Sequence, residues 1–113
     1  MIPLRHLEQR FMKDSTPLKL GALASDLARL ANLARSREVD VCALQNILTE
    51  IKFFTEWVGK EVSLSAQQII LSLQRTLAHW KTEELSAEKC FEIEQESKKW
   101  SDVILGIYGL LVK

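Results

Sequence analysis

Histidine is the first side chain to consider for acid–base or metal chemistry, and the chain has two, His6 and His79. Arg75 and His79 are one helical turn apart, as in the arginine–histidine pairs of small helical ribonucleases, although the spacing here is shorter. Thr76 stands where a di-iron bundle motif has glutamate, and no glutamate is adjacent to either histidine as in a zincin motif. The sequence therefore predicts no catalytic and no metal-binding residue.

A run of glutamates is the second candidate, because carboxylate oxygens are ligands for Mg²⁺. The run comprises Glu83, Glu84, Glu88, Glu92, Glu94 and Glu96. Helical nucleotide pyrophosphatases direct acidic residues inward from two facing helices, whereas Glu92 and Glu96 fall outside the apolar stripe of their helix. Lys89 and Lys99 lie close enough to neutralise part of the charge. We therefore expect a water-facing surface and no cofactor, and we predict that the chain is not an enzyme.

Three tryptophans, Trp57, Trp80 and Trp100, fall on the apolar faces of predicted helices. In an antiparallel bundle they lie at different heights, so filling the core is their expected role. The candidate for a ligand pocket is Trp80, near the bundle end where Cys42 and Cys90 are also expected. Two cysteines so far apart in the sequence predict reduced, buried thiols rather than a disulfide framework or a zinc site.

The composition is that of one globular domain. The chain has 113 residues, of which 47% are hydrophobic and 27% are charged. Fifteen basic and fifteen acidic residues cancel, so no overall field attracts nucleic acid or an anionic membrane. The first residues are too polar for a secretory signal, and the longest apolar run, 103–112, is about half of a membrane span. We expect a soluble, cytoplasmic protein with neither nucleic-acid nor membrane partner.

The elements that must position these side chains are all predicted to be helices. The last third of the chain carries an apolar stripe whose spacing alternates between three and four residues, as one face of an α-helix requires. The stripe consists of Cys90, Ile93, Ser97, Trp100, Ile104, Ile107 and Leu111. Ser86 is the expected cap of this helix, which continues to about Leu111.

Three further long helices are predicted upstream, over residues 15–37, 41–58 and 65–81. The last of these begins with a capping box formed by Ser65 and Gln68. In the first, small residues beside the leucine stripe predict that a neighbouring helix approaches closely. They are Gly21, Ala24, Ser25, Ala28 and Ala31. Short connections force sequential helices to run antiparallel. The expected fold is therefore all-α, an antiparallel up-down four-helix bundle over residues 15–113, with residues 1–14 as an N-terminal arm or short extra helix.

Several short segments resemble a known group of proteins. They are Thr16–Gly21, Asp26–Arg29, Phe53–Trp57 and Trp100–Asp102. In these segments the chain resembles a family of small uncharacterised cyanobacterial helical-bundle proteins, over about residues 16–111. The resemblance implies a cyanobacterial context and a helical fold. It implies no activity and no site residue, because the group has no established activity.

The end of the last helix is apolar outside its stripe as well, and such a helix needs cover on more than one side. The N-terminal segment or a second copy of the chain could supply that cover. The candidate interaction surface comprises Leu7, Phe11, Leu105, Tyr108, Leu110 and Val112.

The leading functional prediction is a non-catalytic protein-interaction or structural module that forms a homodimer or binds another protein. The alternative is a small-ligand-binding or sensory bundle with a pocket near Trp80. A metal-dependent or ribonuclease-like enzyme has the least support. The sequence sets neither the partner nor the biological process.

Overall fold

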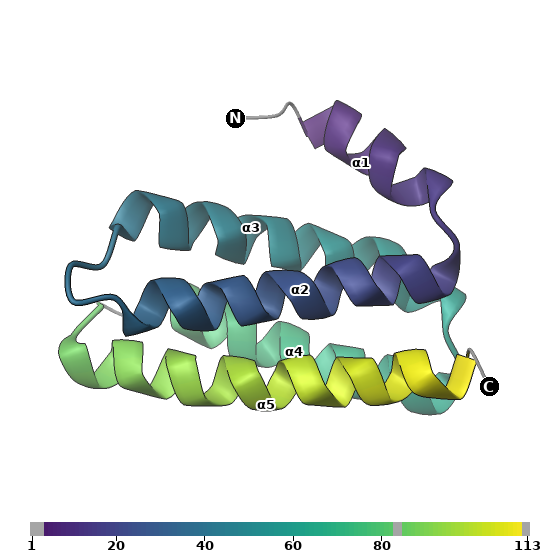
Figure 1. The fold of residues 1–113 in the computed structure, drawn as a ribbon. Coiled ribbons are helices and arrows are strands. Elements are labelled where there is room, and N and C mark those ends of the chain that lie inside the picture. The colour runs from purple at the N-terminus through teal and green to yellow at the C-terminus, as the bar shows by residue number, and fades with distance from the viewer. Residues whose placement is uncertain (1–3, 83–84, 112–113) are drawn as a thin grey trace.

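The computed structural model describes residues 4–82 and 85–111, and the side chains of residues 82, 110 and 111 are left aside. The described residues form helices and no strand, which confirms the all-α class. In chain order the elements are α1 (Leu4–Lys13), α2 (Thr16–Arg35), α3 (Val41–Val58), the short 3₁₀ helix η1 (Gly59–Glu61), α4 (Leu64–Thr82) and α5 (Ala87–Leu111). Helices α2 to α5 lie side by side as a helical bundle, and α1 lies above α3 (Figure 1). Among the described helices, none combines the length and apolar character needed to cross a membrane.

Side chains that accept backbone hydrogen bonds set the starts of α3 and α5. Asp40 accepts a hydrogen bond of 3.0 Å from the amide of Ala43. Ser86 accepts one of 3.0 Å from the amide of Lys89, so the predicted cap of α5 is confirmed. These caps define the helix starts at the end of the bundle where α2 connects to α3.

The start of α4 differs from the prediction, because Ser65 and Gln68 do not form the capping box. The hydroxyl of Ser63 accepts from the amide of Ala66 at 3.2 Å, and the side-chain amide of Gln67 donates to the carbonyl of Val62 at 3.2 Å. The backbone carbonyl of Ser63 also accepts a hydrogen bond of 2.8 Å from the amide of Gln67, so Ser63 is the residue that caps the helix. The helix therefore begins at Leu64, one residue before the predicted start.

Helix α2 is the centre of the hydrophobic core. Its inward side chains are shielded completely from solvent, with 0% exposure for Leu20, Leu23, Leu27 and Leu30. The other three helices of the bundle contribute Ile51, Leu73, Ile93 and Ile104, among others, to the same cluster. The leucine stripe of α2 thus packs against aliphatic side chains that come from separate parts of the sequence.

The contact between α2 and α5 is especially close because small residues line it. Ala24 and Ala31 of α2 are 2% and 1% exposed, and Ser97 and Ser101 of α5 are also buried. The hydroxyl of Ser101 donates a hydrogen bond of 2.9 Å to the backbone carbonyl of Ala24. A side chain as short as serine reaches a neighbouring backbone only when the two helices lie very near each other. This α2–α5 seam confirms the predicted close approach at Ala24 and Ala31, whereas Ser25 and Ala28, for which the sequence predicts the same role, are exposed.

Helix α1 is held by Phe11, which is 4% exposed. Its ring stacks on that of Phe54 in α3 with the centroids 4.2 Å apart, and the ring of Trp57 lies 5.7 Å away. The break at Asp14 and Ser15 separates α1 from α2, as the predicted boundary requires. The N-terminal segment is therefore a short helix docked on α3.

Replacing Ala24 by leucine should lower the free energy of unfolding by about 1–3 kcal/mol, because extra methylene groups in the α2–α5 seam force the helices apart. The matched control is Ala28→Leu, one turn further along the same helix at an exposed position, where the change should stay within about 0.5 kcal/mol. Urea denaturation followed by circular dichroism measures both values. Equal losses in the two variants would contradict the close seam.

Candidate functional site

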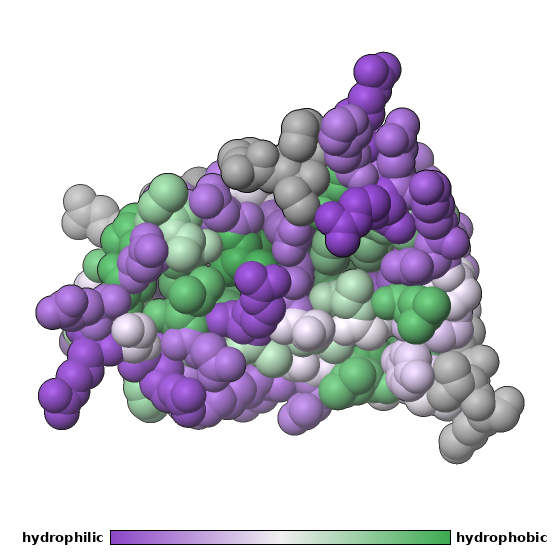
Figure 2. Space-filling view, turned by 45° about the horizontal axis from the view of Figure 1, so that its top comes forward, coloured by the Kyte–Doolittle hydropathy of each residue, from purple (hydrophilic) through white to green (hydrophobic). Residues whose placement is uncertain are grey.

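A cavity of about 480 Å³ opens at the end of the bundle where α2 connects to α3. Two stretches of the chain form its walls: residues 34–41, from the last turn of α2 to the first residue of α3, and residues 85–94, from just before α5 through its first two turns. In Figure 2 a hydrophobic area lies over the half of the molecule that carries this end. The lining residues are Ala34, Arg35, Ser36, Arg37, Val39, Val41, Leu85, Ser86, Ala87, Cys90, Phe91 and Glu94.

The cavity is apolar inside and charged at its margin. Phe91 and Val41 border it and leave 63% and 47% of their surface exposed, values high for large hydrophobic side chains. Arg35 and Arg37 are exposed on the α2 side, and no ion pair or hydrogen bond engages either side chain within the described ranges. The carboxylate of Glu94 accepts a hydrogen bond of 3.3 Å from Lys98.

The predicted pocket residues Trp80, Cys42 and Cys90 are not brought together. Trp80 is 2% exposed and borders a second, smaller hollow of about 300 Å³, with Leu85 shared between the two hollows. Cys90 is buried and lines the larger cavity, as a core thiol should. Cys42 is exposed on the first turn of α3, so the expectation of a buried thiol is wrong there. The inward face of α3 is set by Leu44, and position 42 falls outside it.

The predicted interaction surface is also divided. Phe11 packs inside the chain against α3 and is unavailable to a partner, while Leu7 is half-buried. On α5, Leu105 is 45% exposed and Tyr108 is half-buried. The side chains of Leu110 and Val112 lie outside the described residues.

Several residues considered for catalysis and metal binding are exposed on helix surfaces, whereas Glu94 is half-buried and Glu83 and Glu84 lie outside the described residues. Arg75 and His79 are exposed on α4, and Glu92 is exposed on α5, where it accepts a hydrogen bond of 2.7 Å from Lys89. Glu96 is half-buried, so it faces water only in part. In residues 4–82 and 85–111 no group of three or more histidine, cysteine or acidic side chains is placed to hold a metal ion.

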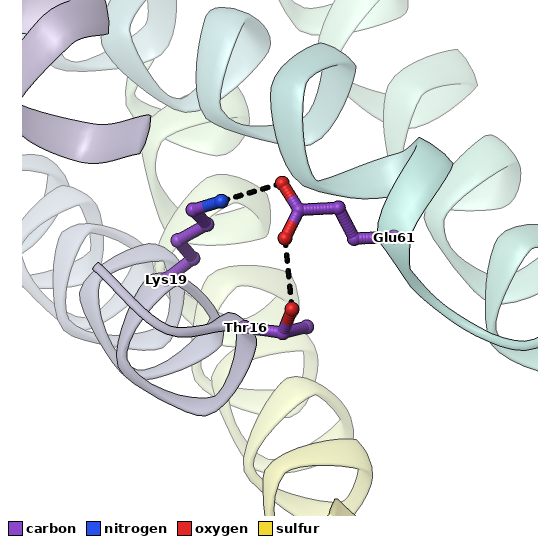
Figure 3. A network of polar contacts seen from close by, with 3 residues as sticks. All are labelled: Thr16, Lys19 and Glu61. Carbon is purple, nitrogen blue, oxygen red and sulfur yellow. Dashed lines mark hydrogen bonds and ion pairs between the residues drawn. The ribbon is translucent and has the colours of Figure 1, made fainter. Parts of the chain in front are cut away.

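A polar network lies at the opposite end of the bundle (Figure 3). The ammonium group of Lys19, which is 4% exposed, donates to one oxygen of Glu61, and the hydroxyl of Thr16 donates to the other at 2.8 Å. Lys19 Nζ also lies 6.0 Å from the centroid of the Phe11 ring. The hydrogen bond from Lys19 lowers the pKa of Glu61, because it stabilises the carboxylate. This network connects the start of α2 to η1, the short helix that follows α3, with α1 packed beside it.

A second polar contact, in which a buried acidic group has no buried cation beside it within the part of the chain that the structure describes, lies between α2 and α3. Asp26 is 5% exposed, and burial followed by a hydrogen bond with Glu50 raises its pKa to about 8. Arg29, with NH1 3.6 Å from Asp26 Oδ1, opposes the shift but is largely exposed. Asp26 Oδ2 is buried and has no hydrogen-bond partner among the described residues, so a negative charge on this carboxyl group would be poorly stabilised. Burial therefore favours the protonated form of Asp26 at neutral pH.

The sequence pattern predicts little of the cavity or of the polar contacts made by Lys19 and Asp26. Phe91 is an apolar residue outside the apolar stripe of α5. This position is the one feature of the sequence that indicates the cavity. Lys19 and Asp26 are seven residues apart, so they share a face of α2 beside the leucines. That spacing predicts two charged groups directed at one neighbouring helix.

Because the folded-state pKa of Asp26 lies above the ordinary 3.8 of an unfolded chain, the folded state holds the extra proton between pH 3.8 and about 8. The contribution of this group to stability is fully present below that range. It falls by up to about 1.4 kcal/mol per pH unit as the pH rises, and it is lost above pH 8. We expect Asp26→Asn, whose neutral amide has a similar shape and does not titrate, to remove this decline and to exceed the wild type in stability at pH 8.

Urea denaturation at a series of pH values between 4 and 8 measures the difference between the two proteins. The control is Asp102→Asn on the exposed face of α5, which should leave the decline unchanged. If the wild type and Asp26→Asn kept a constant difference over this range, the raised pKa of Asp26 would be refuted.

No protein-family model, curated protein or solved structure matches this chain. The resemblance to the cyanobacterial group therefore stays a prediction from the sequence.

Proposed function

We propose that the chain is a non-catalytic protein-interaction module of the cytoplasm, an up-down-up-down four-helix bundle with a short N-terminal helix, and that it forms a homodimer. The order of contacts supports the topology, because α2, α3 and α4 each contact the next helix along the chain and α2 also contacts α5. The exposed positions of Arg75 and His79 give no support to a catalytic role.

The observation that carries the proposal is the exposure of Leu105. This leucine stands in the most apolar part of α5, yet it remains 45% exposed although α2 packs along the same helix. Leu18 is 58% exposed in the first turn of α2, at the same end of the bundle. A second copy of the chain that covers these side chains would gain about 25 cal/mol for each Å² of apolar surface removed from water. The docking of α1 on α3 leaves this end of α5 for a partner.

Equilibrium sedimentation tests the homodimer. We expect a two-chain mass for the wild type, and Leu105→Glu should weaken the dimer at least about tenfold, because a buried carboxylate at the contact is costly. The matched control is Leu71→Glu on α4, since Leu71 is also 45% exposed. A one-chain mass of the wild type at all concentrations, or equal effects of the two substitutions, would refute the proposal.

A second candidate function is small-ligand binding at the end of the bundle where α2 connects to α3. The two neighbouring hollows favour it, because they share Leu85 and one of them is bordered by Trp80. An indole at the edge of such a hollow changes its fluorescence when a ligand displaces water from its surroundings.

Titration of the chain with a panel of metabolites, followed by tryptophan fluorescence, tests this second function. A ligand of this site should shift the emission of the wild type and should leave that of Trp80→Phe unshifted. Trp57 and Trp100 remain in the variant and serve as internal controls. If no compound changes the wild-type emission, or if the change persists in Trp80→Phe, ligand binding beside Trp80 is excluded.

A further inference from the structure

The larger cavity combines an apolar wall with unengaged positive charge. Its volume of about 480 Å³ lies in the range of small-molecule sites. Leu85, Cys90 and Phe91 form one wall, and Arg35 and Arg37 stand on the opposite side, at the end of α2 and in the loop after it. The site therefore offers different chemistry to the two ends of a ligand.

The charges at the margin favour an anion. In the described part of the lining the charged side chains are Arg35, Arg37 and Glu94. Glu94 already accepts a hydrogen bond from Lys98, whereas neither arginine has an ion-pair or hydrogen-bond partner among the described residues. A guanidinium group presents parallel N–H donors that match the two oxygens of a carboxylate. Two such groups on one side of a cavity can bind an anionic head group.

The apolar wall favours a hydrocarbon body. Phe91 is 63% exposed in the second turn of α5, with its side chain at the edge of the cavity, and Val41 is 47% exposed on the α3 side. Covering this surface with hydrocarbon is favourable, because apolar area is removed from water. Cys90 and Ala34 are buried behind it and close the inner wall.

We propose that this cavity binds a small amphipathic anion, with a carboxylate on Arg35 and Arg37 and a hydrocarbon chain against Leu85, Cys90 and Phe91. The inference rests on the second candidate function, ligand binding at this end of the bundle, and it names the class of ligand. Charge complementarity with the two arginines distinguishes this ligand from a neutral apolar one.

Calorimetric titration of the full chain with sodium octanoate at neutral pH tests the proposal. We expect saturable binding of one octanoate per chain, and at least about tenfold weaker binding to the double variant Arg35→Gln, Arg37→Gln. The control double variant, Lys60→Gln with Arg75→Gln, removes the same charge at exposed positions that do not line the cavity and should bind like the wild type. Phe91→Ser should also weaken octanoate binding, and its exposed position allows the fold to be retained.

Two further ligands separate the contribution of the carboxylate from that of the hydrocarbon chain. 1-Octanol lacks the carboxylate, and acetate lacks the hydrocarbon chain, so both should bind more weakly than octanoate. If 1-octanol binds as tightly as octanoate, or if the arginine double variant retains wild-type affinity, the anion site is overturned while ligand binding at this end stands. If neither octanoate nor 1-octanol shows saturable binding and the Trp80 fluorescence test is also negative, both the inference and the second candidate function fail.

Discussion

The fold depends on the seam between α2 and α5. The hydrogen bond from Ser101 to the carbonyl of Ala24 spans 2.9 Å, and a buried hydroxyl without an acceptor is costly, so this bond sets how the two helices are aligned. Close packing at Ala24 and Ala31 places α5 over one side of the leucine stripe of α2. The remaining side then needs α3 and α4, which supply aliphatic residues such as Ile51 and Leu73. The architecture therefore follows from how closely one pair of helices can approach.

Charged side chains are buried in two different ways where α2 packs against α3 and η1. At one end, Lys19 meets Glu61, and opposite charges satisfy each other with help from Thr16. Further along, Asp26 is buried near Glu50, a group of the same kind, and burial together with this neighbour raises the pKa of Asp26. The first contact keeps its strength at neutral pH because Glu61 is ionised there. The second becomes weaker as the pH rises, so the α2–α3 contact is the pH-sensitive side of the bundle.

The sequence predicts those features that depend on a single helix and fails where several segments meet. The stripe of α5 is confirmed at Ile93, Ser97 and Ile104, because helical periodicity alone directs these side chains inward. The small residues of α2 correctly predict a close neighbour. The burial of Phe11 against α3 and the exposure of Cys42 depend on which helix lies opposite, which periodicity does not contain. The cavity is built by two stretches distant in sequence, residues 34–41 and 85–94, so from the sequence alone Phe91 is only an apolar residue outside a stripe.

The two ends of the bundle differ in how they are closed, and this separates the two proposed contacts. At the end with Glu61, the Phe11 ring of α1 and the Lys19 network close the space between α2 and α3. At the other end no helix lies across the opening among the described residues, and the cavity lies beside the α2–α3 connection. Helix α2, with 20 residues, separates these ends by about 30 Å. A ligand at Arg35 and a second chain at Leu105 would therefore not compete for the same surface, and any influence of one on the other would have to pass along the α2–α5 seam.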